Sequence, residues 1–130
     1  MRAESVGRGF VVLPGLHAVC RLPAGTPVPG WAAGNFVSIT STADELSVMC
    51  PADRVPGEIK AERDWRVLKV VGPFPFSTVG VIASFASPLA VAQISLLAVA
   101  TFETDYLLVK ADTLERTITV LTSAGHRQML

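Results

Sequence analysis

Two histidines and two cysteines are the residues most able to hold a metal ion or to act as nucleophiles. They are His17, Cys20, Cys50 and His126, and a set of four could form a zinc site. Residues three apart on a strand point to opposite faces, so His17 is expected to face outward when Cys20 faces inward. Neither a Cys-x-x-Cys nor a His-x-x-x-His pair is present. We therefore predict two buried, reduced thiols, two surface histidines and no metal site.

Other catalytic arrangements are equally weak. The same strand geometry disfavours a Cys–His nucleophile, and no serine lies in a Gly-x-Ser-x-Gly motif. Glu103 and Asp105 could form an acid–base pair, but they lie in a predicted turn, where solvated carboxylates are the commoner explanation. Because no nucleophile, base and orienting group occur together, we predict a protein that is not an enzyme, with no catalytic residues and no cofactor.

The segment GPFPFSTVGV, residues 72–81, has chemistry suited to a small anion. It lacks both Gly-x-Gly-x-x-Gly and the P-loop lysine, which disfavours a nucleotide. Ser77 or Thr78 could cap a following helix, and the free amides of residues 79–81 would then lie at the positive end of its dipole. An ordinary capped helix start without a ligand explains the same pattern, and the segment alone leaves both explanations open.

A turn elsewhere in the chain offers the complementary charge. In a split βαβ unit, the loop 72–81 and the turn 101–106 lie at the same end of the sheet. The loop amides could hold a carboxylate, while Asp105, Glu103 or strand-end carbonyls hold an ammonium or guanidinium. Recognition of a free amino acid requires this combination.

Composition excludes several classes of protein. Of 130 residues, 50% are hydrophobic and 17% are charged, which is too apolar for a disordered chain. Eleven Lys and Arg balance eleven Asp and Glu, so no net field attracts nucleic acid, and the low charge favours self-association. Two cysteines and no apolar stretch after the opening MRAESVGRGF argue against secretion. We expect a cytoplasmic protein with no nucleic-acid partner.

The stretch 70–102 contains no charged residue and exceeds the roughly 20 residues of a membrane helix. Prolines and glycines interrupt it, and its apolar periodicity changes halfway. Strand end, loop, helix and central strand fit it better than one helix. We therefore expect no membrane segment.

Hydrophobic periodicity predicts short strands in the first half and a mixed order in the second. The first half gives strands near 10–13 and 16–22, a loop over 23–35, a hairpin over 37–50 and a polar segment over 52–63. The second half gives a strand over 65–71, a helix from Ser77 or Thr78 to Ala92, an interior strand over 94–101, a strand over 106–110, a helix that starts with an Asp112–Glu115 capping box and ends at Gly125, and a strand over 127–130. This β-α-β-β-α-β order is the ferredoxin-like unit, and the first half allows a second, degraded copy.

Residues 58–126 resemble the ACT domains of small bacterial ACT proteins, a subfamily related to aspartokinase regulatory domains and to arginine sensors of the CASTOR type. The resemblance rests on motifs that occur in order: Trp-Arg at 65–66, Gly-Pro and Phe-Ser within 72–77, Gly-Val at 80–81, Ser-Pro-Leu-Ala at 87–90 and Thr-Phe-x-Thr-Asp-Tyr at 101–106. The first half, from LPGLHAVCRLP to FVSITSTADELSVMC, resembles the degenerate ACT half of the same proteins. The implied α+β fold has two ACT-like, ferredoxin-like units in tandem, a degenerate unit over 1–62 and an ACT domain over 63–130.

The resemblance also implies a regulatory homodimer that binds a free amino acid or similar small zwitterion at a dimer interface. The implied ligand-binding residues are Ser77, Thr78, Val79, Gly80, Val81, Thr101, Phe102, Glu103 and Asp105. The chain departs from the family pattern at Gln93, Ala100 and Glu103, where Gly, Ser and Asp are common. A structural self-association module whose ligand site has decayed is the alternative.

Overall fold

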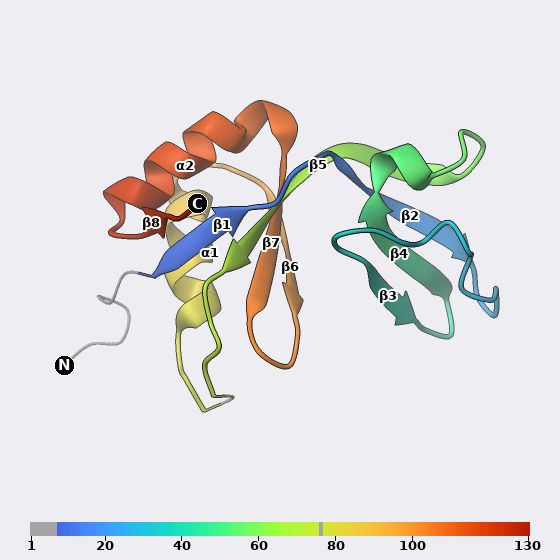
Figure 1. Ribbon diagram of the computed structural model, residues 1–130, viewed down its shortest axis with the longest axis horizontal. Helices are drawn as coiled ribbons and strands as arrows, with labels where there is room; N and C mark the ends of the chain where they lie inside the picture. The colour runs from blue at the N-terminus through green and yellow to red at the C-terminus, as the bar shows by residue number, and fades with distance from the viewer. Residues whose placement is uncertain (1–7, 76) are drawn as a thin grey trace. The chain divides into compact units, whose positions relative to one another are not determined.

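The computed structural model describes residues 8–75 and 77–130, which fall into two compact units (Figure 1). Of the described residues, 8–13 combine with 66–75 and 77–130 in one unit, which we call the discontinuous unit; residues 14–65 form the inserted unit. This division differs from the predicted boundary at 62/63. The reason is that β1 (Gly9–Val12) pairs antiparallel with β5 (Lys60–Val70) and parallel with β8 (Arg127–Gln128), although it precedes the inserted unit in sequence.

The inserted unit is an antiparallel sheet in the order β3-β4-β2-β5, to which β5 contributes its first residues. Its other strands are β2 (His17–Pro23), β3 (Ser38–Ser41) and β4 (Glu45–Pro51). Numbered along the unit, this is the strand order of a ferredoxin-like fold. A loop over 24–37 and the short 3-10 helix η2 (Ala52–Arg54) stand where that fold has its helices. This agrees with the predicted degraded copy.

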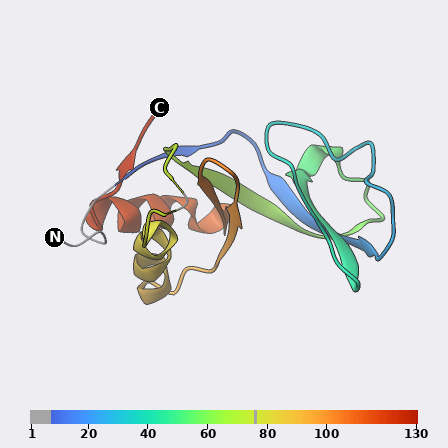
Figure 2. The same ribbon diagram turned by 90° about the horizontal axis from the view of Figure 1, so that it is seen from below.

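The discontinuous unit has the predicted β-α-β-β-α-β order and adds β1. Its elements after β5 are α1 (Val81–Val91), β6 (Leu96–Ala100), β7 (Asp105–Lys110), the 3-10 helix η3 (Ala111–Thr113), α2 (Leu114–Ser123) and β8. The strand order is β6-β7-β5-β1-β8, so β1 separates β5 from β8. Both helices lie on one side of β1 and β5 (Figure 2).

One apolar core joins the helices to this sheet. Phe85 of α1 meets Phe10 of β1 edge to face, with ring centroids 6.3 Å apart. Leu121 is fully buried in the same core, and Leu114 and Ile118 pack against it, as the predicted stripe of α2 requires. Burial of the apolar helix faces therefore fixes α1 and α2 on the sheet.

Both predicted helix starts are wrong. Helix α1 begins at Val81, because Gly80 is its N-cap in the left-handed conformation with φ 83°, and no side chain caps the helix. Thr78 instead donates its backbone N–H to the Pro75 carbonyl in a preceding turn. The Asp112–Glu115 capping box is also absent, because η3 precedes α2 and no side chain caps that helix.

The predicted interior strand after α1 is wrong as well. Among the described residues, β6 pairs only with β7, so it forms one edge of the sheet. Before it, Gln93 adopts φ 60°, a conformation usually left to glycine, and Ile94 donates its N–H to the Leu89 carbonyl at 2.9 Å. The helix end is thus kept without the glycine common in the family, at a cost of roughly 1 kcal/mol.

The surface positions expected for the two histidines are also wrong, because both are buried. The register between β2 and β5 shifts between His17 and Val19, so His17 and Ala18 are buried in succession and the alternation fails there. His17 lies 3.2 Å from the Asn35 side-chain oxygen and packs edge to face on Phe36.

Cys20 and Cys50 are buried and unpaired, as predicted. Burial raises the pKa of the Cys20 thiol. The pKa of Cys50 is raised to about 11, mainly by burial and further by the nearby Cys20 and Asp53. Because the thiolate is the reactive form, neither group suits nucleophilic chemistry at neutral pH.

Within the described residues, no three or more His, Cys, Asp and Glu side chains gather closely enough to bind a metal ion. The same part of the chain has no helix with the length and apolar character needed to cross a membrane.

The buried His126 supplies a hydrogen-bond donor in place of the backbone N–H that a proline in α1 lacks. Pro88 lies inside α1 and has no N–H for the Ser84 carbonyl four residues earlier. His126 Nε2 lies 2.8 Å from that carbonyl, and Nδ1 accepts the Arg8 backbone N–H at 3.1 Å. Because a carbonyl can only accept and an N–H can only donate, the proton must be on Nε2. The ring also stacks on Phe85 at 3.8 Å, so one side chain ties α1 to both ends of the chain.

We expect His126→Phe to lower the free energy of unfolding by roughly 1–3 kcal/mol, because it leaves two backbone groups without partners. In a Pro88→Ala background, the new N–H can serve the Ser84 carbonyl, so the same substitution should cost less. Urea unfolding of the four variants measures this difference. An equal cost of His126→Phe in both backgrounds would show that the histidine does not replace the missing donor.

Candidate functional site

The turn between β6 and β7 is built on two threonines. Thr101 donates both its backbone N–H and its hydroxyl to the Thr104 carbonyl, each at 2.9 Å. The buried hydroxyl of Thr104 in turn donates to the Val70 carbonyl at 2.6 Å. These bonds fix the turn against the end of β5 and set the position of Asp105, which follows directly.

The loop after β5 lies against this turn. A Cβ atom at Gly72 would lie 3.0 Å from the Glu103 carbonyl oxygen and 3.2 Å from Thr104 Cβ, so the close approach favours glycine. Phe74 donates its N–H to the same Glu103 carbonyl at 3.3 Å. The loop and the turn thus meet at one end of the sheet, as the sequence predicted.

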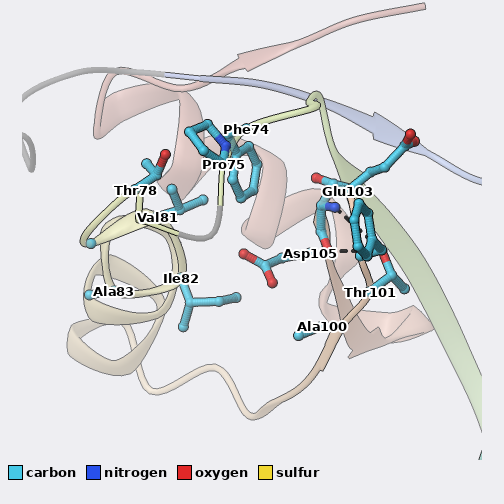
Figure 3. Close-up of a pocket in the computed structure, with 13 residues that line it drawn as sticks. Phe74, Pro75, Thr78, Val81, Ile82, Ala83, Ala100, Thr101, Glu103 and Asp105 are labelled. Carbon is cyan, nitrogen blue, oxygen red and sulfur yellow. Dashed lines mark hydrogen bonds between the residues drawn. The ribbon is translucent and has the colours of Figure 1, made fainter.

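A cavity of about 410 Å³ lies between the loop, the turn and the start of α1 (Figure 3). Its lining is Phe74, Pro75, Thr78, Gly80, Val81, Ile82, Ala83, Ala100, Thr101, Phe102, Glu103, Thr104 and Asp105. All of the predicted site residues line it except Ser77 and Val79. Val79 is 76% exposed and borders a second hollow, which residues of α1 and Ala124 also line.

Sequence reasoning missed several lining residues for identifiable reasons. Phe74 and Pro75 belong to the loop 72–81, but their apolar side chains do not by themselves mark them as ligand contacts. Ile82 and Ala83 line the cavity because α1 starts at Val81 rather than at Ser77 or Thr78. A correct helix start would therefore have placed the first turn of α1 at the cavity.

Two acidic residues of the turn point in different directions. The Asp105 carboxylate points into the cavity, whereas the exposed Glu103 side chain extends away from Asp105 (Figure 3). Burial raises the pKa of Asp105 above its ordinary value of 3.8. None of the described residues gives this carboxylate a hydrogen bond or an ion pair. Asp105 is therefore a partly desolvated acid without a partner in the described protein.

The opposite wall carries positive partial charge. The first helical hydrogen bond of α1 runs from the Ser84 N–H to the Gly80 carbonyl at 2.9 Å, so the N–H groups of residues 81–83 have no helical acceptor. No side chain caps them, and they lie at the positive end of the helix dipole. One cavity thus combines a helix N-terminus with an unpaired carboxylate, a pair complementary to a small zwitterion.

Comparison with known families identifies the fold. A family model described as the ACT domain matches residues 60–123, which include every residue that lines the cavity. The chain is an ACT-domain protein. A second model, described as an N-terminal domain, matches residues 15–58 and nearly coincides with the inserted unit.

Two known proteins share 30% or more of their sequence with the matched part of this chain. A crystallised Agrobacterium tumefaciens protein shares 40% identity with this ACT-domain protein, covers 95% of it over 93% of its own chain, and superposes with a TM-score of 0.90. The Mus musculus cytosolic arginine sensor for mTORC1 subunit 1 is 31% identical over 103 residues, which are 76% of this chain. This chain spans only 30% of the length of that sensor.

A more distant likeness supports the fold alone. The ligand-free regulatory subunit of aspartate kinase from Thermus thermophilus has a TM-score of 0.62 at 12% identity, and the match covers 92% of this chain and 99% of the subunit. The α+β, ferredoxin-like ACT fold predicted from the sequence is thereby confirmed.

We expect Asp105→Asn to raise the free energy of unfolding at pH 7 by less than about 1 kcal/mol. Because burial raises the folded-state pKa above the ordinary 3.8, the native state binds more protons than the unfolded state between these two values. The ionised carboxylate therefore destabilises the native state at neutral pH. The advantage of Asn should disappear as the pH falls through the folded pKa to below 3.8. Urea unfolding across this range measures it; a gain that persists in acid would contradict the burial argument.

Proposed function

We propose that this ACT-domain protein is a non-catalytic, cytoplasmic regulatory module that binds a free amino acid or similar small zwitterion in the cavity beside α1. The observation that carries the proposal is the unpaired Asp105 carboxylate facing a helix N-terminus across one cavity. A ligand carboxylate would accept hydrogen bonds from the amides of residues 81–83. Its ammonium or guanidinium would pair with Asp105.

The remaining lining residues fit this role. Thr101 and Phe102 border the ligand from the turn, while Thr78, Gly80 and Val81 border it from the loop and helix. The small side chain of Ala100 leaves space at the strand end. Ser77 and Val79 lie outside the cavity lining, and the exposed Glu103 points away from Asp105, so the proposed site assigns them no ligand contact.

The name of the mouse relative makes L-arginine the first ligand to test. A guanidinium can form two parallel hydrogen bonds with one carboxylate, which suits the single acid that enters this cavity. The sensor's other properties are not carried over, because this chain matches less than a third of its length.

A homodimer is part of the same proposal, with the ligand site at its interface. The chain has no net charge. Val79, just before α1, is 76% exposed, and Val91, the last residue of α1, is 86% exposed. Such apolar surface favours association with a second copy. We expect light scattering on a sizing column to give twice the 13.8 kDa chain mass, whereas a monomer at micromolar concentration would refute the dimer.

A thermal-shift screen of the free amino acids, with L-arginine first, tests the ligand. A ligand at 100 times its dissociation constant adds about 2.7 kcal/mol of stability. Calorimetry should then show that Asp105→Asn weakens the binding of the selected amino acid by roughly thirtyfold to several thousandfold, because a charged contact is lost at a desolvated site.

Asp112→Asn is the matched control, since it removes an exposed carboxylate of the same unit outside the cavity. It should bind like the unmodified protein. Unchanged affinity in folded Asp105→Asn would remove Asp105 from the site. A stable dimer that no amino acid stabilises would favour the alternative, a self-association module with a decayed site.

A further inference from the structure

Phe74 forms a wall of the cavity, and a residue far away in sequence holds its ring. The Arg8 guanidinium carbon lies 5.1 Å from the centroid of the Phe74 ring. This is within the range of a cation–π contact, and a planar guanidinium can also stack on an aromatic face. Arg8 itself does not line the cavity, so it does not contact a bound ligand directly.

The backbone of Arg8 is fixed on both sides. Its N–H donates to His126 Nδ1 at 3.1 Å, and its carbonyl accepts the Arg127 N–H at 3.0 Å. His126 is buried and is itself bonded to α1. The backbone that carries the guanidinium is therefore held in place by hydrogen bonds to His126 and Arg127.

The other polar restraint on Phe74 is weaker. Its N–H donates to the Glu103 carbonyl at 3.3 Å, beyond the usual 2.7–3.2 Å range for such bonds. The ring is only partly buried, although it packs against the core of the discontinuous unit. The contact of Arg8 with the Phe74 ring can therefore influence the position of this ring in the cavity wall.

We propose that Arg8 is a positioning residue for the cavity, because its guanidinium holds the Phe74 ring in the wall that borders a bound ligand. The predicted effect on affinity rests on the proposed function, whereas the contact between Arg8 and Phe74 is present in the ligand-free protein. Loss of the guanidinium should loosen the loop at Phe74 and weaken ligand binding by about two- to fivefold, the size expected for one partly exposed cation–π contact.

Amide hydrogen exchange in the ligand-free, full-length protein tests the placement. We expect Arg8→Gln to speed exchange of the residue 74 amide about two- to fivefold, while Arg8→Lys, which keeps a cation, gives an intermediate rate. In a Phe74→Leu background, Arg8→Gln should have no further effect on that amide. Arg127→Gln is the matched control, because it removes an equal charge from the adjacent strand β8 and should leave exchange at residue 74 unchanged.

Calorimetry with L-arginine tests the consequence, with urea unfolding as the measure of general destabilisation. Weaker binding of Arg8→Gln that disappears in the Phe74→Leu background supports the proposal. An equal loss in both backgrounds, fully restored by Arg8→Lys, would show that Arg8 acts only by its charge and would overturn it. Unchanged exchange at residue 74 in Arg8→Gln would also overturn it. Absence of arginine binding in the unmodified protein bears on the proposed ligand alone, since the exchange comparison needs none.

Discussion

The hydrogen bond from the Thr104 hydroxyl to the Val70 carbonyl is the contact on which the cavity depends. It joins the turn between β6 and β7 to the end of β5, from which the loop to α1 departs. Because the turn and the loop start at one buried junction, Gly72 can approach the Glu103 carbonyl and Asp105 faces the start of α1. This hydrogen bond therefore helps to hold the Asp105 carboxylate across the cavity from the partly positive N-terminus of α1.

The second constraint is the proline inside α1. Pro88 leaves a carbonyl without its helical donor, and the fold supplies His126 from beyond the end of α2. That histidine also receives the Arg8 N–H, so the first and last strands and the helix are tied at one buried ring. His126 thereby holds α1, whose N-terminus faces the cavity, through its contacts with Ser84 and Phe85.

Much of this arrangement was predictable because it follows from local patterns. Alternation and helical periodicity predict the order of strands and helices, and motifs such as Thr-Phe-x-Thr-Asp-Tyr carry the family resemblance. The predictions that failed depended on contacts between residues distant in sequence or on backbone geometry. A left-handed Gly80 moves the helix start, a register shift buries His17, and short apolar strands such as β1 do not specify their partners. No local pattern reveals that His126 replaces a donor lost at Pro88.

The central claim is that Asp105 is one half of an ion pair that a ligand completes. The carboxyl resonance of Asp105, followed by carbon NMR as the pH is varied, reports its pKa in the free protein and in the protein saturated with the amino acid that binds. A positive group beside the carboxylate favours its ionised form, so the account predicts that the pKa, raised by burial in the free protein, falls when the ligand binds. An Asp105 pKa that stays the same or rises on binding would contradict it.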